Sequence, residues 1–257
     1  MSAFTLRSVA MDLTRGVGTW TRMAMRRRWA IALSTIALQG CASQEAGQVQ
    51  TTRTRTPPND AQWLENFSGA LNWASPSGHG PDLLARVYRV ENVGGARFLK
   101  ARHDARGEDA PDAMHYGYGF EERAPLLDAT PILQFRWRVR QHPSIGADAW
   151  VDLAASVYVV MKQPSLLSAG RGFKLGWVAK PAALGTRQRG LLQVPLRSDA
   201  ASDTWRKERV DLCALYRQNF GPCEDARILY VGVVTDADGT KSVAAGDYAD
   251  FSLTASP

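Results

Sequence analysis

The sequence predicts an all-β protein, a β-sandwich of mainly antiparallel strands with one or two short helices. Nine β-rich runs are separated by clusters of Gly, Pro, Asn or Asp, which is typical of short strands joined by turns. Strands and helices do not alternate at the spacing that a parallel sheet requires. In the run Phe135–Arg140, apolar and basic side chains alternate completely, so we expect Phe135, Trp137 and Val139 in the core and three arginines on the opposite face.

The predicted strands follow one another from residue 83 to residue 253. They are Leu83–Val90, Ala96–Arg102, Ile132–Arg140, Val151–Lys162, Phe173–Ala179, Gly190–Leu196, Trp205–Leu212, Arg227–Asp236 and Ala244–Leu253. Two further segments, Trp63–Leu71 and Leu212–Phe220, have a helical pattern. We expect Asp211 to cap the second helix, because its side chain can accept a hydrogen bond from a free N–H of the first turn.

The composition, with 22% charged and 45% hydrophobic residues, is that of an ordinary globular protein. It argues against a disordered, collagen-like, disulfide-dense or polytopic membrane chain. The formal net charge is +6, but residues 1–40 hold six arginines against the single acid Asp12. From Cys41 onward the net charge is only +1, so the basic character belongs to the leader and we expect no nucleic-acid partner.

The first 40 residues have the pattern of a secretory signal. Arg26–Arg28 precede the apolar run Trp29–Leu38, which is too short to span a bilayer. Leu38-Gln39-Gly40-Cys41 resembles the bacterial lipobox, so we expect Cys41 to be lipidated. The alternatives are a plain signal peptide with a chance cysteine and, more weakly, a twin-arginine route. Translation could also start at Met23 or Met25, which would make the preceding residues an over-annotation.

The leader also predicts location and domain organisation. Several acyl chains on Cys41 would give stable membrane anchoring, and Ala42 replaces the Asp that usually signals retention in the inner membrane. We therefore expect an outer-membrane lipoprotein that faces the periplasm. Residues 41–60, which include Pro57 and Pro58, read as a flexible tether, and residues 61–257 as one sandwich domain, expected to be a monomer.

The two remaining cysteines, Cys213 and Cys223, lie ten positions apart. In an oxidising compartment a disulfide is the simplest assignment. Two buried free thiols are the alternative. A metal site is disfavoured, because the spacing is not that of metal ligands and no His lies near.

Several segments, in this order, resemble a bacterial family of secreted proteins, the domain of unknown function 3047, from about residue 64 to the end. They are Phe135–Val139, Asp152–Val160, Leu175–Trp177, Trp205–Asp211 with Tyr216 and Phe220–Pro222, and Val233–Thr240 with Ala244–Asp250. The resemblance implies a jelly-roll-like sandwich similar in outline to galactose-binding-like carbohydrate modules, and it implies no established activity. The sequence departs from the family pattern in its cysteine pair and at Ala237.

Acidic residues gather near the C-terminus. We consider Asp236, Asp238 and Asp250 as ligands of a structural Ca²⁺, because hard cations take oxygen ligands and Asp-x-Asp-Gly opens many calcium loops. The bidentate Glu of an EF-hand is absent. The favoured alternative is a turn in which Asp and Gly serve backbone geometry; a catalytic carboxylate pair is the third. No other cofactor is predicted.

The arginine stripe Arg136, Arg138 and Arg140 is the second polar constellation. Guanidinium groups bind carboxylate or phosphate in a bidentate manner, and Tyr158 and Trp177 could complete a sugar platform. The predicted ligand-binding residues are therefore Arg136, Arg138, Asp152, Tyr158 and Trp177. The favoured alternatives are a solvated stripe balanced by Asp148 and Asp152, and core positions for Trp137, Trp177 and Trp205.

The leading functional hypothesis is a lipid-anchored sandwich that binds an envelope saccharide without catalysis. The sequence has no Gly-x-Ser-x-Gly, His-Glu-x-x-His, phosphate loop or dinucleotide fingerprint. One alternative is a glycan-active hydrolase or lyase with acids from Asp148, Asp152, Asp236 and Asp238. A second is a structural envelope module that contacts another protein.

Overall fold

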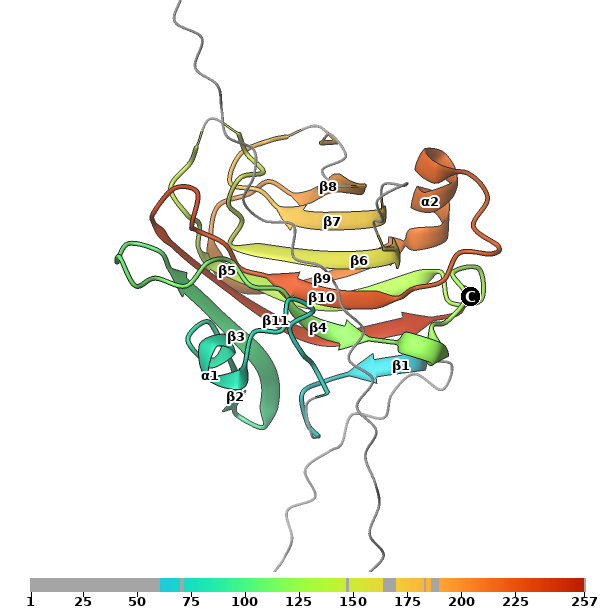
Figure 1. The fold of residues 1–257 in the computed structure, drawn as a ribbon, viewed down its shortest axis with the longest axis horizontal. Coiled ribbons are helices and arrows are strands. Elements are labelled where there is room, and N and C mark those ends of the chain that lie inside the picture. The colour runs from blue at the N-terminus through green and yellow to red at the C-terminus, as the bar shows by residue number, and fades with distance from the viewer. Residues whose placement is uncertain are drawn as a thin grey trace, which may run out of the picture. The chain divides into compact units, whose positions relative to one another are not determined.

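The computed structural model describes residues 61–69, 72–146, 148–163, 170–182, 184–185 and 190–256, which form two β-sheets (Figure 1). Sheet A has the strand order β2-β3-β11-β5-β9, with β1 also paired to β11; its strands are β1 (Ala61–Glu65), β2 (Tyr88–Val93), β3 (Ala96–Asp104), β5 (Ile132–Gln141), β9 (Ser202–Asp211) and β11 (Val243–Thr254). Sheet B has the order β4-β10-β6-β7-β8; its strands are β4 (Tyr116–Gly119), β6 (Ala155–Lys162), β7 (Arg171–Trp177), β8 (Leu191–Arg197) and β10 (Tyr230–Val234).

Neighbouring strands are antiparallel throughout both sheets, except for the parallel pair β7 and β8. The chain crosses repeatedly between the sheets, as the position of β4 between the sheet A strands β3 and β5 in the sequence illustrates. The predicted all-β sandwich of mainly antiparallel strands is confirmed.

The core lies between the sheets and follows the predicted alternation. On β5, Phe135, Trp137 and Val139 are fully buried while the intervening arginines are only partly buried. From sheet B, Phe173 and Trp177 of β7 complete the inner layer. Each large side chain of this kind contributes about 1.5–3 kcal/mol by leaving water, so the aromatic-rich inner layer is a main source of stability.

In the described part of the chain, three short helical segments connect the strands. They are α1 (Pro81–Ala85), the 3-10 turn η1 (Glu121–Arg123) and α2 (Leu212–Phe220). The α2 prediction is correct to the residue, and the Asp211 side chain accepts a hydrogen bond of 2.8 Å from the N–H of Ala214, which confirms the predicted cap. The predicted disulfide between Cys213 and Cys223 is also confirmed, and it joins α2 to the segment before β10.

The helix predicted over Trp63–Leu71 is wrong, because residues 61–65 form β1 instead. Glu65 pairs with Phe251 of β11, so pairing with the C-terminal part of this strand outweighs local helical propensity. Phe67 then adopts a positive φ of 59° and ends the extended run. Residues 70–71 lie outside the described part of the chain.

The first predicted strand is only partly correct. The structure begins this region with α1 and reaches a strand at β2 (Tyr88–Val93), because Pro81 at the first helical positions and Asp82 in the first turn favour a helix start. β4 was not among the predicted strands. Its two glycines weaken the β signal of the alternating sequence Tyr-Gly-Tyr-Gly.

The predicted leader, Cys41 and the tether lie outside the described residues. Within the described residues, no helix is long and apolar enough to cross a membrane. Lipidation and location at the outer membrane stay predictions.

Candidate functional site

A groove of about 620 Å³ is formed by α1, β2, β4 and the segment that precedes α1. Its lining is mainly aromatic and aliphatic, with a few polar groups: Trp73, Ala74, Ser75, Gly78, His79, Pro81, Leu84, Ala85, Tyr88, Arg89, Val90, Leu99 and Tyr116. Ligand sites in proteins have this size and this kind of lining. The groove is therefore the first candidate site.

Backbone hydrogen bonds hold one wall of the groove in place. The N–H of Ala74 donates to the carbonyl of Gly117 at 2.8 Å, and the N–H of Gly117 donates back to Ala74 at 3.1 Å. This bridge extends the edge of sheet B beyond β4. It places Trp73 beside Tyr116, with ring centroids 5.7 Å apart in an edge-to-face contact.

Two tyrosines form the aromatic floor. The rings of Tyr88 and Tyr116 are stacked, with centroids 5.3 Å apart and an angle of 30° between their planes. The Tyr88 hydroxyl donates to the carbonyl of Met114 at 2.7 Å and accepts from the N–H of Thr235 at 3.2 Å. Tyr88 is thus buried and fixed, whereas Tyr116 is only partly buried. Tyr116 is the floor ring that a ligand can reach.

Polar groups stand at the rim of the groove. The Ser75 hydroxyl and Nδ1 of His79 lie 3.1 Å apart, within hydrogen-bond distance. This contact orients the imidazole and leaves its Nε2 for another partner. Arg89 is largely exposed and pairs with Glu91 at 2.7 Å. The rim therefore offers an imidazole, a hydroxyl and a guanidinium to a bound molecule.

His115, Tyr158 and Lys174 lie together at the outer face of sheet B. Burial, followed by the positive charges of Lys174 and His79, lowers the pKa of His115 to about 4, so the ring is neutral at neutral pH. His115 packs edge-on against Tyr158 at 4.3 Å between ring centroids. Lys174 faces Tyr158 across the β6–β7 pair and donates to the carbonyl of Trp150 at 3.1 Å.

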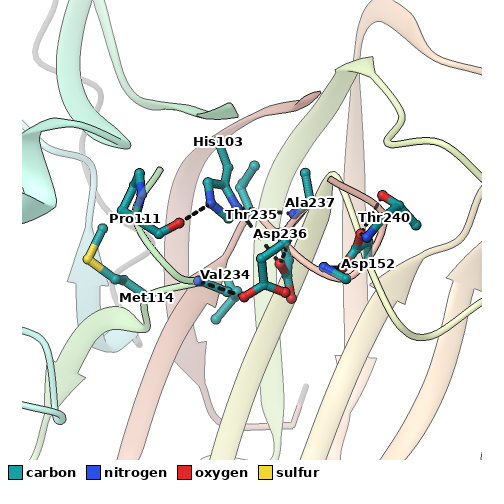
Figure 2. A network of polar contacts seen from close by, with 12 residues as sticks. His103, Pro111, Met114, Asp152, Val234, Thr235, Asp236, Ala237 and Thr240 are labelled. Carbon is teal, nitrogen blue, oxygen red and sulfur yellow. Dashed lines mark hydrogen bonds and ion pairs between the residues drawn. The ribbon is translucent and has the colours of Figure 1, made fainter. Parts of the chain in front are cut away.

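Three carboxylates, those of Asp152, Asp236 and Asp238, lie with one oxygen of each within 4.8 Å of the others. Asp152 precedes β6, and the other two follow the adjacent strand β10. Oδ1 of Asp152 accepts from the N–H of Gly239 at 3.1 Å, and Oδ2 accepts from the N–H and the hydroxyl of Thr240 at 2.7 and 2.5 Å (Figure 2). Asp152 therefore holds the β10–β11 turn closed.

His103 supports the same turn from β3. Its Nδ1 accepts from the N–H of Ala237 at 3.1 Å, and its Nε2 lies 2.7 Å from the carbonyl of Pro111 (Figure 2). These partners require a bare Nδ1 and a protonated Nε2, which is the neutral imidazole. The approach of Asp236 to Nδ1 at 3.8 Å is accordingly not an ion pair.

The half-buried Asp236 carboxyl has a strongly raised pKa. Burial, followed by the nearby charges of Asp238 and Asp152, raises its pKa from 3.8 to about 7, against the opposing effect of a hydrogen bond from the N–H of Asp238 and the charge of Lys174. Lys174 is itself buried, which lowers its pKa. Asp236 can therefore hold a proton near neutral pH.

The cluster fits a closed turn better than a calcium site. Each Asp152 oxygen already accepts hydrogen bonds. Asp236 accepts one from the N–H of Asp238, and Asp238 accepts one from the N–H of Ala113, both at 3.1 Å. Ca²⁺ takes six to eight oxygen ligands. Calcium binding stays a prediction, and the structure assembles a different set of residues from the predicted one.

Asp250, predicted with Asp236 and Asp238, lies elsewhere. Its carboxylate pairs with Nε of Arg136 at 2.6 Å, from a position of positive φ where β11 and β5 lose register. Arg138 and Arg140 both bind the fully buried Asp247, at 2.7 and 2.9 Å. The arginine stripe is thus balanced by acids, as the favoured alternative held. The acids are neighbours on β11 and not Asp148 and Asp152, because β11 pairs with β5.

The predicted aromatic platform beside the arginines has different members. Trp177 is fully buried between the sheets, and Tyr158 lies on the outer face of sheet B. Trp177 is therefore a core residue, as the alternative held, and it cannot stack on a sugar. The aromatic next to the arginines is Trp205 of β9, whose ring lies 4.8 Å from the Arg138 guanidinium. Trp205 is only partly buried and does not belong to the core.

Sequence reasoning missed the groove. Trp73, Tyr88 and Tyr116 come from three segments that meet only in the fold. The alternating run of β4, with two tyrosines on one face and glycines on the other, was the available signal. His115 directly precedes that run, so recognition of β4 would also have marked it.

Comparisons with known proteins give no assignment. No protein-family model matches the chain, and no curated protein matches it. A cleaved adhesin domain of Lys-gingipain from Porphyromonas gingivalis is 15% identical over 76% of this chain and 98% of that one, with a TM-score of 0.36. A mutant ENZbleach xylanase is 10% identical over 73% of this chain and 82% of that one, with a TM-score of 0.38. Both similarities are too weak to support an argument, and membership of the 3047 family stays a prediction.

Proposed function

We propose that this protein binds a saccharide of the bacterial envelope in the groove, without catalysis. The observation that carries the proposal is the combination of a reachable tyrosine ring, Tyr116, with convergent polar groups in one concave site. Sugars present both an apolar ring face and hydroxyl groups, so they need these two kinds of contact together.

The geometry suggests how a sugar would lie. The apolar face of a pyranose would stack on Tyr116, with the edge of Trp73 beside it. Sugar hydroxyls would then meet Nε2 of His79 and the guanidinium of Arg89 at the rim. Because Tyr88 and His79 are already held by hydrogen bonds, little ordering would be required on binding.

We further propose that a lipid on Cys41 tethers the domain to the periplasmic face of the outer membrane. The lipobox-like sequence supports this. Replacement of Cys41 by Ala should release the protein from the membrane fraction. Continued membrane association of this variant would show that the lipid anchor is wrong.

A glycan array tests the binding proposal. The wild-type protein should bind one or more envelope glycans. Tyr116→Ala should lower the affinity for them by about tenfold, because the stacking surface is removed. Tyr116→Phe keeps the ring and should retain binding, which makes it the matched control. If the wild-type protein binds none of the acidic and neutral envelope glycans, the proposal is wrong.

The rival function, glycan hydrolysis, is favoured by one observation, the raised pKa of Asp236 beside Asp238. A proton-holding carboxyl next to a second carboxylate is the arrangement of a general acid and its partner. The groove lining includes neither residue. Release of reducing ends from a bound glycan, abolished by Asp236→Asn, would establish hydrolysis and overturn binding without catalysis.

A further inference from the structure

The outer face of sheet A gathers basic side chains from four strands. Strand register places them on one surface, since Arg89 pairs with Lys100, and Lys207 pairs with Arg136, while the opposite face is core. We call this surface the cationic face; its basic residues are Arg89, Lys100, Arg102, Arg136, Arg138, Arg140, Lys207 and Arg209.

Acids on the cationic face are fewer than its eight cations. They are Glu91, Asp104, Asp203, Asp211, Asp247 and Asp250. Several of them are shared: Glu91 binds both Arg89 and Lys100, and Asp247 binds two arginines. From residue 61 onward the chain has only one more basic than acidic residue. The face therefore carries an excess of positive charge that the rest of the domain offsets.

Two exposed cations lie at one side of this face. The side chains of Lys207 and Arg209 have no hydrogen bond or ion pair with another described residue. They neighbour Trp205, on which the guanidinium groups of Arg136 and Arg138 lie at 5.3 and 4.8 Å from the ring centroid. Both cations are thus available to a partner.

We propose that the cationic face binds an acidic polysaccharide, a sugar chain that carries carboxylate or phosphate groups. Neighbouring strands lie about 4.8 Å apart, so a chain laid across β5 and β9 would meet a cation at each strand. Guanidinium forks match carboxylate and phosphate geometry. This surface lies outside the groove apart from Arg89, so the proposal goes beyond binding of a sugar in the groove.

The same charges would attract an anionic membrane, but the aromatic residues argue against that partner. Insertion into a bilayer surface needs apolar side chains that project outward. Phe98 is almost buried, and Arg138 covers it at 5.3 Å as well as covering Trp205. The aromatics of this face are therefore held within it, which favours a hydrophilic chain.

The test measures binding of a fluorescent oligogalacturonate to the full chain carrying Cys41→Ser, so that a lipid does not itself retain the protein on membranes. Binding should weaken from 50 to 200 mM salt because it depends on exposed charges. Lys207→Glu with Arg209→Glu should lower affinity roughly tenfold. Both positions are exposed, so the double variant should keep the wild-type melting temperature.

The matched control reverses the same number of charges outside sheet A, with Arg123→Glu and Lys162→Glu. It should bind as the wild type does. Equal losses in both double variants, or absence of wild-type binding, would overturn the proposal. So would binding to phosphatidylglycerol vesicles without binding to the oligosaccharide. Tyr116→Ala should leave this binding unchanged, which separates the cationic face from the groove.

Discussion

The two outer faces of the sandwich handle polar groups in opposite ways. On sheet A, arginines lie at the surface and are paired with acids, of which Asp247 is fully buried beneath two of them. On sheet B, the register row Gly232, Tyr158, Lys174 and Gln193 runs across the face, and its side chains are almost buried and form no ion pair with any described residue.

Buried charges are thus compensated differently on the two sheets. On sheet A the acids lie beside cations, so removal of one partner of a buried pair should lower the stability of the fold. At sheet B and its adjoining turn, burial raises the pKa of Tyr158 and Asp236 and lowers that of Lys174. The turn that holds Asp236 should therefore make stability depend on pH between about 4 and 7.

The largest expected effect is on sheet A. Asp247→Ala leaves Arg138 and Arg140 close together without their shared acid, and should lower the free energy of unfolding by about 3 kcal/mol. The measurement is urea denaturation. Asp250→Ala breaks a partly exposed pair and should cost about 1 kcal/mol or less. Similar losses in both variants would refute the distinction between buried and exposed pairs.

A second effect should appear at the β10–β11 turn as pH changes. The folded chain holds the Asp236 proton up to about pH 7, whereas the unfolded chain releases it near pH 3.8. This group therefore stabilises the fold at low pH, and the stabilisation is lost as pH rises through 7. Asp236→Asn should be more stable than the wild type at pH 8, on the order of 2 kcal/mol. The advantage should vanish near pH 4. Parallel stability curves for the two proteins would contradict the buried carboxyl.

The smallest effects compare two buried tyrosines. The Tyr248 hydroxyl, beneath sheet A, contacts Thr235, Val234 and Ser156 at 2.9 to 3.3 Å, so Tyr248→Phe should cost about 1 kcal/mol. The buried Tyr230 hydroxyl, on the outer face of sheet B, has no hydrogen-bond partner among the described residues. Tyr230→Phe should be neutral or stabilising by up to about 1 kcal/mol. Thermal melts of both variants check the order, and a loss in Tyr230→Phe would reveal a partner.

Local signals explain which parts of the fold were predictable. The capping Asp211 and the Gly221 that ends α2 mark both helix ends within a few residues. The alternation of β5 likewise fixes which side chains are buried. The segment 61–65 has no such signal, because its strand depends on pairing with residues near the C-terminus.

The candidate sites were less predictable, for the same reason. Asp236 and Asp238 are close in sequence and follow β10. Their third partner, Asp152, precedes β6, and it lies beside them because β6 pairs with β10. Arg138 finds its acid on β11 and its aromatic neighbour on β9. These neighbours follow from strand order, which periodicity alone does not give.

The most direct test of saccharide binding in the groove is an NMR titration of the labelled protein with the glycan that gives the strongest array signal. If a saccharide occupies the groove, the side-chain signals of Trp73, His79 and Tyr116 should show saturable shifts, which should be absent in Tyr116→Ala. Shifts confined to Asp236 and its turn, or no saturable shift of the groove residues, would contradict it.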